Sequence, residues 1–89
     1  MAKYIQIPTS IEGIPNILFN TNNIDNVLLS GSRTFSIYSN GKSFGLTTNV
    51  GGSKATVAAI YNAMLAVNGP VLVDVIMPTG VVIESILVS

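Results

Sequence analysis

The dipeptide Asn40-Gly41 constrains the fold of this chain more than any other feature of its sequence. It separates two runs, 34–39 and 42–48, in which apolar and polar residues alternate. An Asn-Gly pair favours a two-residue type I′ turn, because both central residues need a positive φ. This loop length brings the apolar residues of both runs onto one face, as the pairs Phe35–Leu46 and Ile37–Phe44. The turn and the alternation therefore predict the same antiparallel hairpin.

A second hairpin is predicted from the runs 71–77 and 81–88, which the tripeptide Pro-Thr-Gly at 78–80 joins. This tripeptide suits a type I turn that ends in a left-handed glycine. The resulting register sets Asp74 opposite Glu84. Both faces of this hairpin are largely apolar. The single predicted helix cannot cover both of these faces and the first hairpin as well. We therefore expect the second face to meet another sheet or another subunit.

Helical spacing of apolar residues predicts one helix over 53–68. Ser53 is the expected N-cap, and the sequence Asn-Gly-Pro at 68–70 is expected to end the helix. The predicted apolar face consists of Val57, Ile60, Tyr61, Met64 and Val67. We expect Val57, Ile60 and Met64 of this face to pack on the sheet.

The first third of the chain is less regular. Residues 3–9 read as a strand, and Pro8 suggests that this strand lies at an edge or ends there. The segment 10–26 is rich in turn formers, and the apolar run 17–19 adds a further strand. The fold class predicted for 1–89, taken as a single domain, is α+β. It is expected to be a small, mostly antiparallel β-barrel or curled sheet of five or six short strands with one helix.

The composition excludes several chemistries. The 89 residues include no cysteine and no histidine, so disulfides, thiolate nucleophiles and imidazole ligands or bases are excluded. No arrangement of the remaining residue types predicts an enzyme, a cofactor site or a metal site. No secretory signal and no apolar run of about 18 residues is present, so an intracellular protein is expected. Charged residues make up 9%, against about 25% in typical domains. Such a surface favours a homo-oligomer.

The second apolar face of the C-terminal hairpin is the predicted oligomer interface. Its residues are Leu72, Ile76, Val82 and Ile86, flanked by Asp74 and Glu84. The two carboxylates, if they face each other, could also serve acid–base chemistry or hold a cation. Two ligands are too few for a cation that prefers six or more oxygens. We therefore expect these charges to keep the strand edges soluble.

Two glycine-containing motifs invite a phosphate-binding interpretation. The sequence at 41–43, Gly-Lys-Ser, matches the end of a P-loop, but Ser36 stands where the first glycine of that motif belongs. A hairpin, not a strand followed by a helix, surrounds it. The sequence at 51–54, Gly-Gly-Ser-Lys, opens the predicted helix, whose free N–H groups could hold an anion. A plain entry loop with a capping serine is the alternative that we favour, because every helix has such an end.

Nucleic-acid binding is the second function class that we consider. The four cations, Lys3, Arg33, Lys42 and Lys54, are scattered and balanced by four acidic residues, which argues against strong binding by a monomer. A ring of subunits could repeat Arg33 or Lys42 around an axis and build a local patch. Tyr38 could then stack on bases.

The order of elements resembles short uncharacterised proteins of marine tailed bacteriophages. The pattern that carries the resemblance is strand, Asn-Gly-Lys turn at 40–42, strand, helix closed by 68–70, and the two final strands. It implies a phage-encoded or virion component, placed in the host cytoplasm or the virion. The short strands also resemble small SH3-like and Sm-like barrels, although an Sm domain begins with its helix. The function predicted is a non-enzymatic, self-associating structural or assembly protein. The alternative is a ring-forming, Sm-like nucleic-acid-binding module with weak, salt-sensitive binding.

Overall fold

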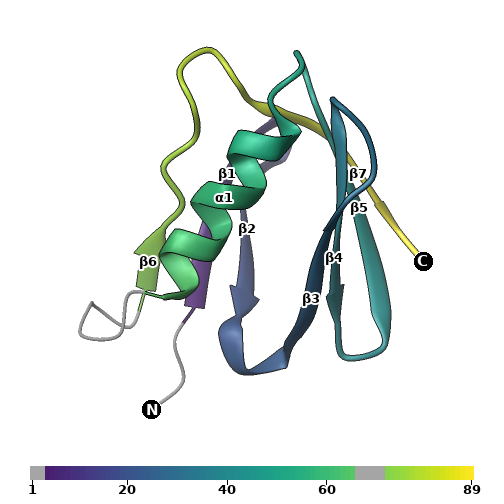
Figure 1. Cartoon of the computed structure of the whole chain (residues 1–89), viewed down its shortest axis with the longest axis vertical. Helices are drawn as coiled ribbons and strands as arrows, with labels where there is room; N and C mark the ends of the chain where they lie inside the picture. Colours follow the sequence, from purple (N-terminus) through teal and green to yellow (C-terminus); the bar gives the residue numbers. More distant parts are fainter. Residues whose placement is uncertain (1–3, 66–71) are drawn as a thin grey trace.

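The computed structural model describes residues 4–65 and 72–89 (Figure 1). These residues form a mostly β structure with one helix, which confirms the predicted α+β class. The elements are β1 (Tyr4–Ile11), β2 (Ile14–Asn20), a short 3-10 helix (Thr21–Asn23), β3 (Ile24–Leu29), β4 (Thr34–Ser39), β5 (Lys42–Thr48), α1 (Ser53–Met64), β6 (Leu72–Asp74) and β7 (Ile83–Val88). The predicted number of five or six strands was wrong, because the described residues form seven. The prediction omitted β3, which begins inside the turn-rich segment 10–26.

All seven strands belong to one mixed sheet. Its order is β2-β1-β7-β5-β4-β3, and β6 pairs with β1 beside this path. β1 runs parallel to β6 and to β7, whereas the other pairs are antiparallel. Within the described residues no pairing joins β2 to β3, so the sheet is not closed. The first strand of the chain therefore lies inside the sheet and is held by strands from the end of the chain.

The β4–β5 hairpin has the predicted turn and the predicted register. Asn40 has a φ of 52° and Gly41 a φ of 76°, as a type I′ turn requires. Phe35 pairs with Leu46, and Ile37 pairs with Phe44. Asn40 is the one non-glycine residue with positive φ in the described part of the chain, which shows how specifically this turn is encoded.

A second tight hairpin, which the sequence did not predict, joins β1 to β2 at Gly13, whose φ is 82°. It keeps β1 paired as far as Ile11. Pro8 therefore marks neither an edge nor an end, contrary to the prediction. It lies between the part of β1 that pairs with β6 and Thr9, which pairs with β7. The register against β2 also shifts there, and such irregular positions tolerate the missing N–H of proline.

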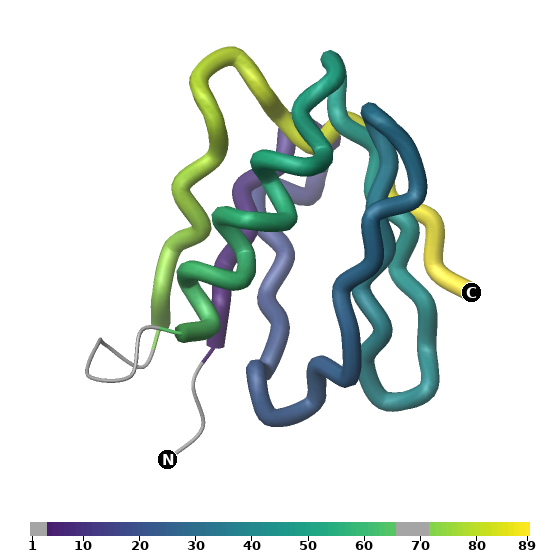
Figure 2. Tube along the Cα trace, viewed as in Figure 1, coloured from purple at the N-terminus to yellow at the C-terminus, as the bar shows by residue number. Residues whose placement is uncertain are grey.

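The predicted C-terminal hairpin does not form. The turn itself is present, since Gly80 has a φ of 79° and the Val81 N–H donates to the Pro78 carbonyl at 3.0 Å. However, β6 pairs with β1 and β7 pairs with β5. Residues 75–82 carry the chain from one strand to the other (Figure 2). The two strands are apolar on both faces because each becomes part of a different region of the sheet.

The helix begins at the predicted residue but is capped differently. Gly52 is the N-cap, and Ser53 is the first helical residue. Its hydroxyl donates to the Gly31 carbonyl, so the prediction of Ser53 as N-cap was wrong. The helix ends at Met64, and the predicted continuation and stop at 66–70 lie outside the described residues.

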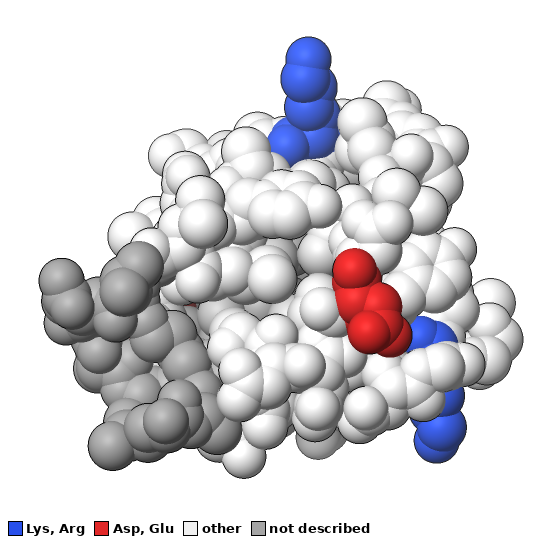
Figure 3. Space-filling model, turned by 60° about the horizontal axis from the view of Figure 1, so that its bottom comes forward, with Lys and Arg blue, Asp and Glu red and all other residues white. Residues whose placement is uncertain are grey.

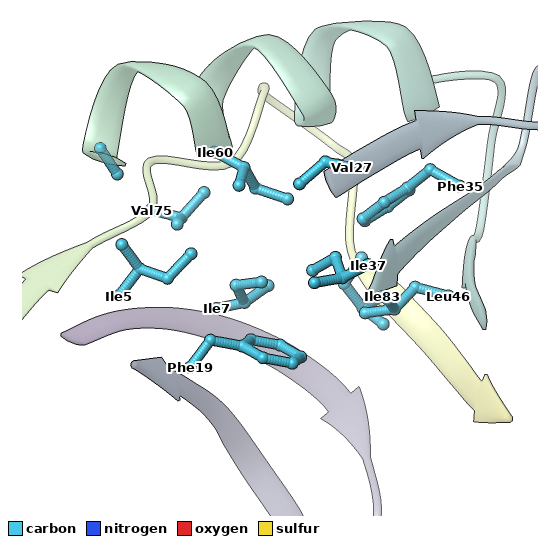
Figure 4. Close-up of a cluster of buried hydrophobic side chains, with 11 residues drawn as sticks. Ile5, Ile7, Phe19, Val27, Phe35, Ile37, Leu46, Ile60, Val75 and Ile83 are labelled. Atoms are coloured by element: carbon cyan, nitrogen blue, oxygen red, sulfur yellow. The ribbon is translucent and has the colours of Figure 1, made fainter. Parts of the chain in front are cut away.

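Ile60 fixes which side of α1 meets the sheet. It is fully buried, and Figure 4 shows it pointing from α1 into the space between β1 and the β3–β4 region. Val57 and Met64 are partly buried against the same core, as predicted. Tyr61 is exposed instead, and Val67 lies outside the described residues. The helix also contributes Ala63, and Val75 follows β6. The rest of the core comes from the strands, as Ile5, Ile7, Phe19, Val27, Phe35, Ile37, Leu46 and Ile83.

Candidate association surfaces

An exposed apolar face covers the outer side of β6, β1 and β2. The side chains of Ile5 and Ile7 are buried, so their neighbours Tyr4 and Gln6 point outward because side chains alternate along a strand. The register pairs Tyr4 with Leu72 and Gln6 with Leu18. Paired residues share a face of the sheet. We call this surface the outer β1 face; its members are Tyr4, Gln6, Leu18, Leu72, Asp74 and Ile76.

Ile76 is the most exposed apolar residue of the outer β1 face. Its side chain is 84% exposed, whereas Val75 is 2% exposed. The Val75 N–H donates to the Gln6 carbonyl at 2.9 Å, so the alternation of β6 continues beyond its last residue. Leu18 is 57% exposed. Tyr4, Leu18 and Leu72 are therefore held on paired strands, and Ile76 follows Val75, whose N–H is bonded to β1.

The polar pair on the outer β1 face is satisfied internally. Gln6 Nε2 donates to Asp74 Oδ1 at 2.9 Å. The Asp74 carboxylate thus has a partner within the sheet and does not face Glu84. The predicted carboxylate pair is absent because the hairpin that would have aligned the two residues does not form.

The six predicted interface residues lie in separate places. Leu72, Asp74 and Ile76 belong to the outer β1 face. Val82 is exposed next to the start of β7, where its backbone exchanges hydrogen bonds with Asn49. Ile86 is partly buried and packs against the core. The structure therefore keeps half of the predicted residues on one surface.

Glu84, the sixth residue, forms an ion pair with Arg33. The Arg33 Nη2 and Glu84 Oε1 atoms are 2.6 Å apart, and the two side chains are 50% and 43% exposed. Arg33 Nε also donates to the Thr48 carbonyl at 3.0 Å. A pair exposed to this extent contributes at most about 1 kcal/mol. Its main effect is to fix the Arg33 side chain across β5 and β7.

The residues considered for nucleic-acid contact are not gathered into a patch. Arg33 precedes β4 and is ion-paired, whereas Lys42 begins β5 at the Asn-Gly turn, at the other end of the hairpin. Tyr38 pairs with Ser43 near Lys42. On the face drawn in Figure 3, basic side chains lie far apart on a largely uncharged surface, and one of them lies beside an acidic side chain. A positive patch would need residues from several subunits.

A groove of about 640 Å³ lies beside the start of α1, where the sequence motif 51–54 suggested an anion site. Its lining consists of Leu29, Gly31, Ser32, Gly51, Gly52, Ser53, Lys54, Ala55 and Ala58. The Ser53 N–H donates to the Ser32 carbonyl at 3.2 Å, so this helix-start donor is used within the protein. The groove is mainly apolar, with Lys54 as its charged member. The sequence indicated the loop but not the hollow, because Leu29 and the 31–32 turn come from a distant segment.

A smaller hollow of about 210 Å³ lies on the outer side of β4 and β5, next to Leu87 of β7. Ser36 and Gly45 pair with each other in this part of the sheet, and Gly45 also pairs with Leu87. Leu87 is 74% exposed and was not among the predicted interface residues. Alternation from Ser85 would have placed it on an outer face, but its partner strand could not be known from the sequence.

Neither hollow includes a carboxylate from the chain. Among residues 4–65 and 72–89 no three acidic side chains gather as metal ligands. Within the same residues no helix has the length and apolar character needed to cross a membrane.

Comparisons with known proteins add no relative to this picture. No family model matches the chain, and neither the curated proteins nor the solved structures provide a match. The function is therefore argued from the surfaces of the molecule.

Proposed function

We propose that this chain is a non-enzymatic structural module that associates with copies of itself. The outer β1 face is the observation that carries the proposal. Its apolar side chains project from β1, β2 and β6 and from Ile76 just beyond β6, and its one polar pair is already hydrogen-bonded. This surface carries one charge, that of Asp74, which already accepts a hydrogen bond from Gln6, so the surface that association removes from water is mainly apolar.

The size of the molecule is compatible with such a role. A standard protein interface buries about 800 Å² on each partner. The chain exposes 5150 Å² in total, so an interface of that size would occupy about one-sixth of its surface. In this proposal the sheet curls around the core, and α1 packs on its inner side. The outer β1 face lies on the outer side of the sheet. The further proposal of a phage or virion component is based on the sequence resemblance alone.

Ile76→Asp tests the proposal. A charge at this exposed position leaves the core intact but is costly to bury against an apolar partner. The wild-type chain should form an oligomer by size-exclusion chromatography with light scattering, and Ile76→Asp should lower its mass. Val50→Asp is the matched control, because Val50 is, like Ile76, an exposed β-branched apolar residue, but it lies in the loop after β5. It should keep the wild-type mass.

Circular dichroism of both variants should match that of the wild type. A wild-type chain that remains a single 9.3 kDa species at high concentration would refute self-association. An oligomer whose mass is the same in the wild type, Ile76→Asp and Val50→Asp would show that the outer β1 face is not the contact.

A further inference from the structure

The carboxyl-terminal half of β7 has an open hydrogen-bonding edge. Ser43 and Ser89 exchange both backbone hydrogen bonds, at N–O distances of 3.0 and 2.9 Å. Bonded and non-bonded pairs alternate along an antiparallel ladder, so the backbone groups of Ile86 and Val88 point away from β5. On that side of β7, within the described part of the chain, β1 pairs at Ile83 and at no later residue. Two N–H groups and two carbonyls therefore face outward.

The other strand edges are protected, as edges in soluble proteins generally are. α1 lies against β3, where the Tyr61 hydroxyl donates to the Val27 carbonyl at 3.1 Å. β2 contains Pro15, which has no N–H to offer. β6 is three residues long. By contrast, residues 85–88 of β7 contain neither proline nor a charged residue, and three of the four are apolar residues that suit a strand.

We propose that β7 pairs antiparallel with β7 of a second copy, around a two-fold axis at Ile86. The inference rests on the proposed self-association and names a strand through which two copies meet. In this register the two Ile86 residues exchange backbone hydrogen bonds, and Val88 faces the partner's Glu84. No like charges oppose each other, which favours a second copy as the occupant. Pairing would join the two sheets into one continuous sheet.

Leu87 adds an apolar contact to this edge. It is 74% exposed on the outer side of the sheet. In the proposed register it lies diagonal to the partner's Leu87, at about 7–8 Å between Cα atoms, which is within reach of long side chains. Substitutions at Leu87 therefore change the contact without changing the core or the ladder to β5.

The test uses Ile76→Asp as the parent protein, because this change removes the contact through the outer β1 face. Light scattering should give the parent a mass of about twice the 9.3 kDa of one chain. Adding Leu87→Lys should reduce the mass to that of one chain, because two lysines repel each other across the axis. Mixing this protein with the parent carrying Leu87→Glu should restore the double mass, because the diagonal charges are then opposite.

Val88→Pro in the same parent tests the backbone contribution. Proline removes an N–H that β5 does not use, so the fold should persist while the dimer is lost. Val88→Ala is the matched control, since it shortens the side chain but keeps the N–H, and it should remain dimeric.

Each outcome decides the matter. A wild-type chain that is monomeric refutes both the proposed function and the β7 pair. An oligomeric wild type with a monomeric Ile76→Asp parent refutes the β7 pair and leaves the proposed function standing. A dimeric parent that Leu87→Lys and Val88→Pro leave unchanged also refutes the β7 pair.

Discussion

Ser53 shows how one side chain can belong to a motif without performing the role expected of it. It follows a glycine pair and opens the helix, which is the usual place of a capping serine. In the structure it is fully buried, and its hydroxyl donates to the Gly31 carbonyl of the β3–β4 connection. It is a donor that ties the helix to a turn 22 positions earlier in the chain. The sequence contains no local signal for that partner.

Ser53→Asp should distinguish the two roles of this residue. Aspartate is among the best N-caps, so a cap would accept it. As a buried donor, Ser53 cannot be replaced by a carboxylate, which has no hydrogen to donate and carries a charge. We expect Ser53→Ala to lower the free energy of unfolding by about 1–3 kcal/mol, and Ser53→Asp to lower it further. Urea unfolding measures both changes. An aspartate variant as stable as the wild type would contradict the role of Ser53 as a buried donor to Gly31.

Gly52 is required because of what lies beside it. A Cβ at this position would come within 2.6 Å of Val81 Cγ2 and 3.0 Å of Cγ1. We therefore expect Gly52→Ala to destabilise the fold by about 1–3 kcal/mol, as overpacking does. Truncation of the buried Val81 to alanine removes both methyl groups. The Gly52→Ala/Val81→Ala double variant should thus be more stable than the sum of the single effects, by about 0.5–3 kcal/mol in a thermal or urea double-mutant cycle. Strict additivity would mean that the two residues do not compete for this space.

Elements that are specified by neighbouring residues in the sequence could be predicted. Elements that depend on partners far away in the sequence could not. The β4–β5 hairpin was correct to the residue because Asn40-Gly41 and the flanking alternation specify the same register. The turn before Val81 was also correct, yet the two strands beside it pair elsewhere. A turn fixes only a change of chain direction. A short strand such as β6, with three residues, forms because it pairs with a particular neighbour, here β1. The outer β1 face was half predicted for the same reason, since β6 alternation was visible and its neighbours Tyr4 and Leu18 were not.

Tyr61 links the helix to the edge strand β3. Its hydroxyl donates to the Val27 carbonyl at 3.1 Å. We expect Tyr61→Phe to lower the free energy of unfolding by about 0.5–1.5 kcal/mol, the usual net value of a hydrogen bond. Tyr38→Phe is the control, because Tyr38 has similar exposure and its hydroxyl has no partner among the described residues. Chemical denaturation of the two variants should give clearly different midpoints; equal midpoints would contradict a stabilising role of the Tyr61 bond.

The whole molecule is compact as a single chain. Its surface of 5150 Å² is close to the roughly 5,000 Å² that the scaling rule gives for a monomer of this mass. The core therefore does not require a partner, and the proposed association would use surfaces that already exist. With four basic and four acidic residues, the molecule also has no net charge that would keep copies apart.

Salt should have little effect on the association, or should strengthen it. The outer β1 face and the β7 edge are uncharged apart from Asp74, which accepts a hydrogen bond from the neutral Gln6 amide, and Glu84, which is ion-paired with Arg33. Raising sodium chloride from about 0.1 M to about 1 M shortens the screening length to about 3 Å, which weakens contacts between charges but not apolar ones. Sedimentation velocity at both concentrations should give the same or a larger oligomer. Dissociation at high salt would indicate an electrostatic contact and would contradict both surfaces.

The central position of β1 has a consequence for the order of folding. Gln6 bonds to a residue 68 positions later, and Ser10 bonds to one 73 positions later. Closing loops of this length costs entropy before any contact is gained, and folds built from such contacts form slowly. During synthesis the β4–β5 hairpin can assemble before β6 and β7 have emerged from the ribosome. Until β6 and β7 emerge, β1, which carries Ile5 and Ile7, can pair only with β2. The later strands β6 and β7 thus complete the pairing of the earlier strand β1.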